Sequence, residues 1–181
     1  MYIASHKKKE NIAEYLLYMW QIEDLIRANN LDMERIKENI IDKFQLDAER
    51  EKELTEWYES LVEMMRREDV TQQGHLQINR NVIIDLNDLH RALLFTQKYP
   101  DYSAAYYKAL PFITELKTKQ NEQDISEIEL ALNFMYGILL LKLQQKEISE
   151  GTQKALTVIS AFLANLSAKY ALYKNNELEF D

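Results

Sequence analysis

Few helix-breaking residues interrupt this chain, and their scarcity restricts it to a small number of long helices. Its 181 residues include three glycines and two prolines, whereas Leu, Glu, Lys, Ala, Gln and Met, which favour helices, are abundant. Apolar side chains recur at spacings of three and four, and no stretch alternates for more than a few residues. The sequence therefore predicts an all-α protein: an antiparallel helical bundle of six or seven helices, forming a single domain over residues 1–181.

Capping residues and the few breakers place the helix boundaries. Asp32, Asp47 and Ser149 are expected to cap helices, and Asp124 opens a capping-box pattern with the acid three residues later. Pro111 is expected to kink or divide the helix that contains it. The predicted helices cover residues 8–29, 32–44, 47–69, 81–98, 103–119, 124–146 and 149–174. Residues 175–181 are predicted to form an acidic, flexible tail.

The residue types that most enzyme and metal sites require are missing or badly spaced. The chain has no cysteine, which excludes disulfides, thiolate metal sites and cysteine nucleophiles. The histidines at positions 6, 75 and 90 include no pair at helical spacing, so no metal site is expected. Gly74 stands alone in its loop, and neither a phosphate-binding loop nor a serine nucleophile elbow occurs. The sequence predicts no catalytic residue, no metal and no cofactor.

Net charge and hydropathy indicate which kinds of partner the chain is expected to bind and where in the cell it is expected to lie. The formal net charge of −8 opposes binding to nucleic acid, because that affinity depends on basic side chains that neutralise phosphates. The apolar run from Phe134 to Leu141 is far shorter than the ~20 residues that cross a bilayer. The N-terminus lacks the apolar segment of a signal peptide. We expect a cytoplasmic protein that binds neither nucleic acid nor membrane.

Glu23 and Arg27 lie in the apolar stripe of the predicted first helix. At 100° per residue, they fall about 20° and 60° from Ile12, and Trp20 borders the same patch. One interpretation is a site for a small polar or charged ligand, in which Arg27 holds a carboxylate or phosphate. The other is a structural ion pair between Glu23 and Arg27, with the remaining hydrogen bonds made to a neighbouring helix.

His90 is a second candidate, since it lies on the apolar face of the helix over residues 81–98. A lone inward histidine is either a hydrogen-bonded core residue or a base or ligand. It would meet Glu23 if the first and fourth predicted helices were neighbours. The predicted ligand-binding set is therefore Trp20, Glu23, Arg27 and His90. The tyrosines around Pro100 either line a pocket or pack at the edge of the core.

Two later helices carry surfaces suited to contact with another helix. Apolar residues cover more than half the circumference of the helix over residues 124–146, which is typical of a helix central to the core or shared with a second subunit. The small residues Ser160, Ala164 and Ala168 recur every four positions on the next helix, suiting close packing in the core or at a dimer seam. Gly137 is expected to receive a residue such as Ile159.

The segment from Asn11 to Arg27 (NIAEYLLYMWQIEDLIR) resembles the opening of an uncharacterised family of bacterial proteins, chiefly from Bacteroidetes. Members of that family are about as long as this chain and have no assigned activity. The resemblance implies that the whole chain belongs to one family, and it implies no mechanism.

These observations favour a non-enzymatic cytoplasmic protein that acts through contacts between helix faces, either with a protein partner or as a homodimer through one of the two later helices. The alternative is a small-molecule-binding protein, or an unrecognised enzyme, with a polar pocket formed by Glu23, Arg27 and His90 between helices. The sequence leaves the identity of the ligand or partner open.

Overall fold

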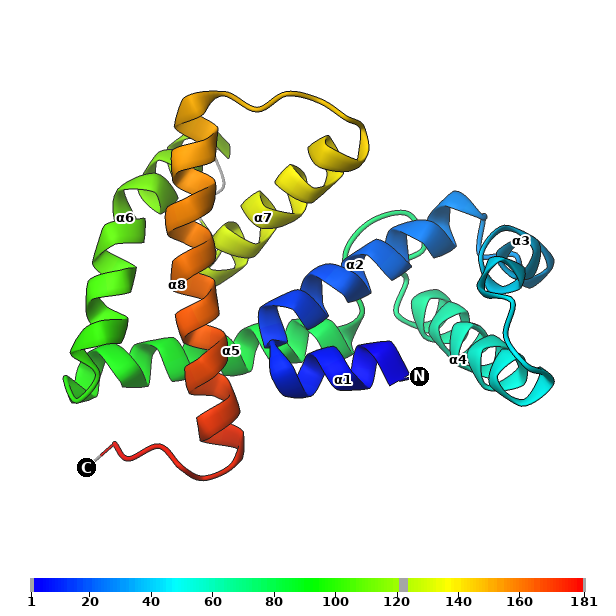
Figure 1. The fold of residues 1–181 in the computed structure, drawn as a ribbon, viewed down its shortest axis with the longest axis horizontal. Helices are drawn as coiled ribbons and strands as arrows, with labels where there is room; N and C mark the ends of the chain where they lie inside the picture. The colour runs from blue at the N-terminus through cyan, green and yellow to red at the C-terminus, as the bar shows by residue number, and fades with distance from the viewer. Residues whose placement is uncertain (1, 121–123, 181) are drawn as a thin grey trace.

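The computed structural model describes residues 2–120 and 124–180, and all secondary structure in these ranges is helical (Figure 1). This confirms the all-α prediction. The described residues form eight α-helices, rather than six or seven, and one short 3-10 helix, η1. Their bounds are α1 (Tyr2–Glu10), α2 (Ile12–Ala28), α3 (Met33–Asn39), η1 (Ile41–Phe44), α4 (Ala48–Arg67), α5 (Gln77–Thr96), α6 (Pro100–Gln120), α7 (Glu127–Leu143) and α8 (Glu150–Lys174).

The extra helix arises because Asn11 interrupts the predicted first helix. Asn11 has an extended backbone, and its side-chain oxygen accepts hydrogen bonds from the backbone N–H groups of Ala13 and Glu14, at 3.1 and 3.2 Å. A residue in this role begins a new helix. The helix predicted from residue 8 therefore starts at Ile12, and α1 precedes it.

Most of the other helix starts follow local capping chemistry. Asp32, Asp47 and Ser149 cap α3, α4 and α8, as predicted. The cap of α7 is Ser126 rather than Asp124, because the Ser126 hydroxyl accepts a hydrogen bond from the backbone N–H of Glu129 at 3.1 Å. The predicted boundary was therefore two residues early.

Both prolines of the chain belong to α6. Pro100 occupies the first position of α6, where a missing backbone N–H costs no helical hydrogen bond. Pro111 lies inside α6, which nevertheless runs as one helix from Pro100 to Gln120, so the prediction of a divided helix was wrong. The preceding helix, α5, starts at Gln77, about one turn earlier than predicted.

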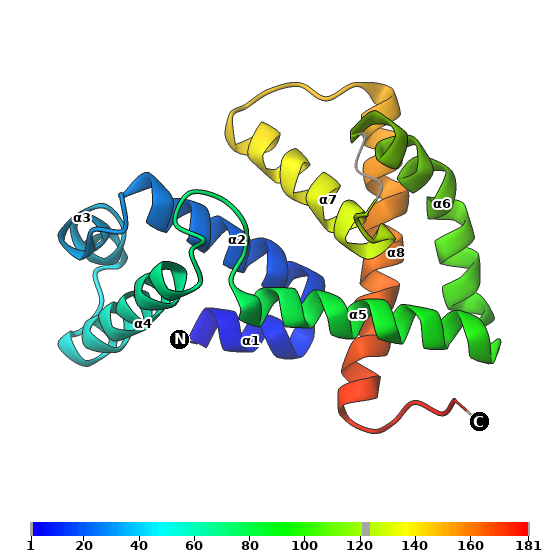
Figure 2. The same cartoon turned by 180° about the vertical axis from the view of Figure 1, so that it is seen from behind.

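Several helices cross one another at steep angles instead of lying side by side along one common bundle axis. Figures 1 and 2 show α5 running across α8, with α6 and α7 on either side of α8 and the α3–α4 pair at the far end of α2. Contacts join α8 to α1, α2, α5, α6 and α7. Buried apolar side chains from α1 to α8 form one hydrophobic cluster. Helix α8 is thus at the centre of the packing.

Helix α8 is also long and apolar enough to span a membrane, and it is the only such helix in residues 2–120 and 124–180. Its buried set includes Ile159, Phe162 and Leu166, each at most 1% exposed. These side chains contribute to the hydrophobic cluster, so packing inside the fold accounts for a large part of the apolar character of α8.

The segment after α8 folds back toward the turn between α5 and α6. The Tyr99 hydroxyl donates to the backbone carbonyl of Glu179 and accepts from its N–H, both at 3.0 Å. The Thr96 hydroxyl donates to the carbonyl of Phe180 at 3.0 Å. Glu179 and Phe180 of the tail that was expected to be flexible make these contacts, while Asp181 lies outside the described residues.

Candidate functional site

Glu23 is the most deeply buried charged residue among those described, with an exposed fraction of 0%. It lies on the face of α2 that also buries Ile12, Leu16 and Met19. The inward orientation expected from helical phase is therefore confirmed. A carboxylate in such a place needs hydrogen-bond donors, because an isolated buried charge is very costly.

Three donors from one short segment of chain surround the Glu23 carboxylate. The Nδ1 atom of His75 lies 2.6 Å from one carboxylate oxygen. The other oxygen accepts from the backbone N–H of Leu76 at 3.0 Å and from the Asn79 side-chain amide at 2.7 Å. Leu76 immediately precedes α5 and has no side-chain cap of its own. Glu23, although it belongs to α2, thus accepts a hydrogen bond from a backbone N–H at the start of α5, as a capping residue next to that helix would. Its negative charge lies at the positive end of α5.

Trp20 covers this arrangement, one turn before Glu23. Its indole stacks on the His75 ring, with centroids 4.3 Å apart and planes 15° from parallel. The Tyr136 ring from α7 meets the same indole edge-on at 5.7 Å. Two buried polar atoms here, Nε1 of Trp20 and Oδ1 of Asn79, have no hydrogen-bond partner among the described residues. We call Trp20, Glu23, His75 and Asn79 the Glu23 cluster.

Arg27 does not pair with Glu23, so the expected intrahelical ion pair is absent from the described contacts. Its guanidinium instead bonds Asp24 at 2.8 Å and the backbone carbonyl of Val70 at 3.1 and 3.3 Å. It also donates to the carbonyl of Gly74, whose φ of +86° suits glycine. A planar guanidinium can serve several acceptors at once. Arg27 therefore holds the loop before α5 at Val70 and Gly74, and Glu23 holds the end of the same loop.

His90 lies in a different part of the core. Asn79 and His90 are eleven residues apart on α5, which corresponds to about 16 Å along the helix axis. His90 Nδ1 is 2.6 Å from the Tyr102 hydroxyl, and its Nε2 is 3.8 Å from Glu127. The structure therefore brings together Trp20, Glu23 and Arg27, but it separates His90 from them.

The surroundings of His90 are mostly aromatic. Tyr102, Tyr106 and Phe162 place their ring centroids within 6 Å of the imidazole, and the Tyr106 hydroxyl donates to Glu127 at 2.8 Å. Burial lowers the pKa of His90, and the nearby Glu127 opposes that shift only in part. Burial likewise raises the pKa values of Tyr102 and Tyr106. This His90 cluster (His90, Tyr102, Tyr106, Glu127) is a satisfied core network with neutral rings.

Sequence reasoning identified Glu23 and Arg27 but missed most of their partners. His75 appeared only as an isolated histidine, and Tyr136, which donates to Asp24 at 2.6 Å, belongs to a helix more than 100 residues away. No local pattern marks these positions as neighbours of α2. That the four predicted residues bind a ligand remains a prediction.

Helix α7 presents a second candidate surface. From Leu130 to Leu141 it has no charged side chain, and its first two turns include the buried residues Ile128, Leu130, Ala131 and Leu132. From Asn133 onward most of its apolar side chains are only half-buried, and Leu143 is 59% exposed. On a helical wheel, four of these half-buried residues fall within about 120° of one another: Phe134, Gly137, Leu140 and Leu141. We call these four residues the α7 face.

The centre of the α7 face is open. A Cβ atom built on Gly137 would have no heavy atom within 4 Å beyond its own helical surroundings. The prediction that Gly137 receives Ile159 was therefore wrong. Ala164 and Ala168 on α8 are exposed, so of the two alternatives for that small-residue row, packing in the core was wrong as well, and a dimer seam stays a prediction. On α8 the larger side chains Ile159, Phe162 and Leu166 are buried instead of Ala164 and Ala168.

Comparison with known families gives one match. A family model described as a domain of unknown function, DUF4924, covers residues 1–177. The chain belongs to the DUF4924 family. Membership in DUF4924 confirms the expected assignment to an uncharacterised family of unknown function, whereas the bacterial lineage of that family remains an expectation. No curated protein and no solved structure matches the chain.

The described side chains offer no cluster for a metal. In residues 2–120 and 124–180, no group of three or more histidine, aspartate or glutamate side chains is arranged to hold an ion. The arrangement of Glu23 and Arg27 chiefly joins α2 to the loop before α5, whereas the α7 face is an apolar helix surface that is only half-buried.

Proposed function

We propose that this protein is a non-enzymatic cytoplasmic protein that acts through helix-face contacts, and that it forms a homodimer through the α7 face. The observation that carries the proposal is the open Gly137 at the centre of a half-buried apolar helix. Glycine inside a helix is destabilising by about 0.5–1 kcal/mol relative to alanine. Its absent side chain is useful where another helix backbone comes close.

The charges of α7 favour a second copy of the same helix as the occupant. Glu127 and Glu129 lie in its first turn, while Lys142 and Lys146 lie at and just beyond its other end. Two copies that cross antiparallel near Gly137 bring the acidic end of each helix toward the basic end of the other. Such a contact is self-complementary about a two-fold axis, which is the commonest symmetry of soluble oligomers.

The composition of the face suits this contact. Phe134, Leu140 and Leu141 flank Gly137, so a partner helix would meet large apolar side chains around a small central position. Burying each of these side chains more completely is favourable by up to about 1.5–3 kcal/mol. Half-buried apolar residues contribute only part of that energy in the isolated chain.

Sedimentation equilibrium at micromolar concentration tests the proposal. The wild-type chain is expected at twice the 21.5 kDa monomer mass, and Leu141→Glu is expected at the monomer mass because a carboxylate would enter the apolar contact. Phe95→Glu is the matched control, since Phe95 on α5 is 90% exposed and lies outside the α7 face. A wild-type chain that sediments as a monomer throughout contradicts the proposal.

A second candidate function is supported by the unpaired polar atoms of the Glu23 cluster. Nε1 of Trp20 can donate a hydrogen bond and Oδ1 of Asn79 can accept one, and neither has a partner among the described residues. Buried polar groups are normally hydrogen-bonded. A small polar ligand beside Trp20 would supply both partners. Native mass spectrometry of the purified chain tests this function, because a bound species should add mass to the wild type and be lost from Trp20→Phe.

A further inference from the structure

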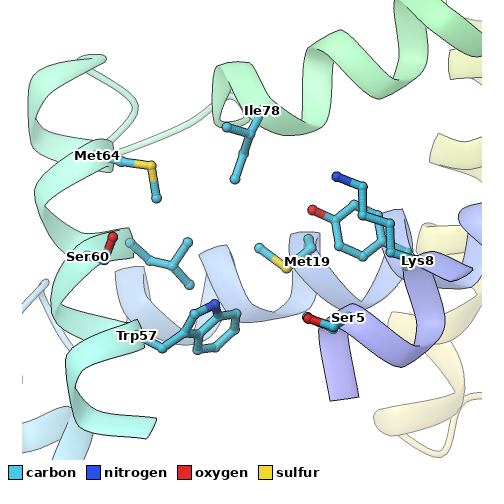
Figure 3. A pocket seen from close by; sticks show the side chains of 10 residues that line it. Ser5, Lys8, Met19, Trp57, Ser60, Met64 and Ile78 are labelled. Carbon is cyan, nitrogen blue, oxygen red and sulfur yellow. The ribbon is translucent and has the colours of Figure 1, made fainter. Parts of the chain in front are cut away.

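We propose that the pocket between α1, α2 and α4 binds a small organic anion with an apolar body, held at its charged end by Lys8. Figure 3 shows the pocket: α2 lies behind it, Ser5 and Lys8 come from α1, Trp57, Ser60 and Met64 from α4, and Ile78 from the start of α5. This site is separate from the Glu23 cluster and from the α7 face.

The depth of the pocket is apolar. Its floor includes Tyr15, Met19 and Leu61, which are at most 6% exposed, while Trp57 and Met64 form half-buried walls. Aromatic rings and methionine side chains make adaptable contacts with hydrocarbon. An apolar group that enters from the rim would therefore replace water on a surface already shaped by three helices.

The rim of the pocket is polar, and the charge on it is positive. Ser5, Lys8 and Ser60 are exposed at the edge, and Lys8 is the only charged residue among the ten that line the pocket. No carboxylate of the described residues lies within ion-pair distance of Lys8, whereas the adjacent Lys7 pairs with Glu14 at 2.9 Å. The Lys8 ammonium instead lies 5.3 Å from the centre of the Tyr15 ring, above the floor of the pocket.

Volume limits the size of the ligand. The cavity measures about 220 Å³, below the ~300–1,000 Å³ typical of sites for drug-sized ligands. Together, one lysine, two hydroxyls and an apolar floor match a monocarboxylate with a short aliphatic chain or a single ring. The carboxylate would bond Lys8 and a serine hydroxyl, and the hydrocarbon would contact Trp57 and Met19.

Octanoate and the neutral 1-octanol are suitable probes for the full-length chain, and Trp57 supplies a fluorescence signal. Octanoate should bind with saturation, change the indole emission, and bind more tightly than 1-octanol. Trp57→Phe should abolish the emission change, since the other tryptophan, Trp20, lies outside the pocket. Calorimetry of the same variants measures affinity independently of fluorescence.

Two substitutions at exposed rim positions test the residues. Lys8→Met keeps an apolar stem and should weaken octanoate binding about tenfold, equivalent to 1.4 kcal/mol, with little effect on 1-octanol. Lys9→Met is the matched control, because Lys9 does not line this pocket. Ser60→Phe should block both probes by filling the cavity, and circular dichroism checks that each variant stays folded.

The outcomes separate the parts of the proposal. No saturable binding of octanoate to the wild type overturns it. Equal affinity for octanoate and 1-octanol, unchanged by Lys8→Met, overturns the anion specificity. Binding that survives Ser60→Phe, or an emission change that persists in Trp57→Phe, places the ligand elsewhere and overturns the assigned site.

Discussion

The backbone N–H of Leu76 donates a 3.0 Å hydrogen bond to the carboxylate of Glu23, so a residue of α2 caps the start of α5. His75 and Asn79 complete the set of donors on either side of Leu76. The cap is tertiary rather than local, and it makes the position of α5 depend on the packing of α2. This contact explains why a carboxylate lies where a packing residue is expected.

Replacing Glu23 should be strongly destabilising. Glu23→Ala leaves a buried N–H, a buried amide and His75 without their acceptor, and removing one partner from such a buried network typically costs about 3–5 kcal/mol. Glu23→Gln keeps one acceptor oxygen and should cost about 1–3 kcal/mol. Urea unfolding followed by circular dichroism measures both, with the exposed Glu59→Ala as control. A Glu23→Ala variant as stable as the control contradicts the tertiary cap.

Arg27 should control the order of the loop before α5. Arg27→Lys keeps the positive charge, but a lysine lacks the planar group that donates to the backbone carbonyls of Val70 and Gly74 at the same time. The amides of residues 70–76 should then exchange with solvent faster, while those in the middle of α5 keep their protection. Hydrogen exchange read by mass spectrometry checks this, and Arg91→Lys, on the exposed side of α5, is the control. Unchanged exchange in the loop argues that Arg27 is dispensable there.

His90 should make the protein less stable as the pH falls. Its pKa is lowered in the folded state, chiefly by burial, from about 6.5 in the unfolded chain. Above that value neither state binds the proton. Below it the unfolded state binds the proton first, so the free energy of unfolding decreases until the pH reaches the folded-state pKa, by up to about 1.4 kcal/mol per pH unit.

Urea unfolding at pH 7 and pH 5 isolates this contribution. The charged neighbours Glu127 and Arg91 also influence the profile, so the comparison is between the wild type and His90→Gln. The variant should lose less stability than the wild type over this interval, by at most about 2 kcal/mol. Identical slopes for the wild type and His90→Gln refute the prediction.

Gly137→Ala should have opposite effects on the monomer and on the dimer. In the monomeric Leu141→Glu background, the added methyl group meets open space and should stabilise the fold by about 0.5–1 kcal/mol through helix propensity. In the wild-type background, the same methyl group lies where the partner helix approaches and should raise the dimer dissociation constant. Thermal unfolding and sedimentation measure the two effects. An alanine that leaves dissociation unchanged shows that the helices do not cross at Gly137.

The parts of the fold that depend on local chemistry could be predicted from the sequence. Asp32, Asp47 and Ser149 cap helices because a side-chain oxygen next to an apolar periodic segment is sufficient. Asn11 was missed, because the residues on both sides of it are compatible with one continuous helix. Pro111 was expected to kink or divide its helix, and division is wrong, since α6 continues through it.

The candidate sites were predictable only in part. Helical phase placed Glu23 inside, but its partners are 52 to 56 residues away along the chain. Their proximity depends on how α2 meets the loop before α5, which no spacing rule encodes. For Ala164 and Ala168 the pattern did not predict burial correctly. A row of small residues suits close packing equally well in a core and on an open surface.

Cysteine cross-linking at Gly137 tests whether two copies of α7 meet at this position, since the natural chain has no cysteine and a single introduced thiol reports one contact. A disulfide requires Cα atoms about 4.4–6.8 Å apart, a distance that two helices reach only where they cross closely. Under mild oxidation, Gly137→Cys should form a covalent dimer rapidly, while Phe95→Cys on α5 should stay largely monomeric. A Gly137→Cys chain that cross-links no faster than Phe95→Cys contradicts a homodimer built on α7.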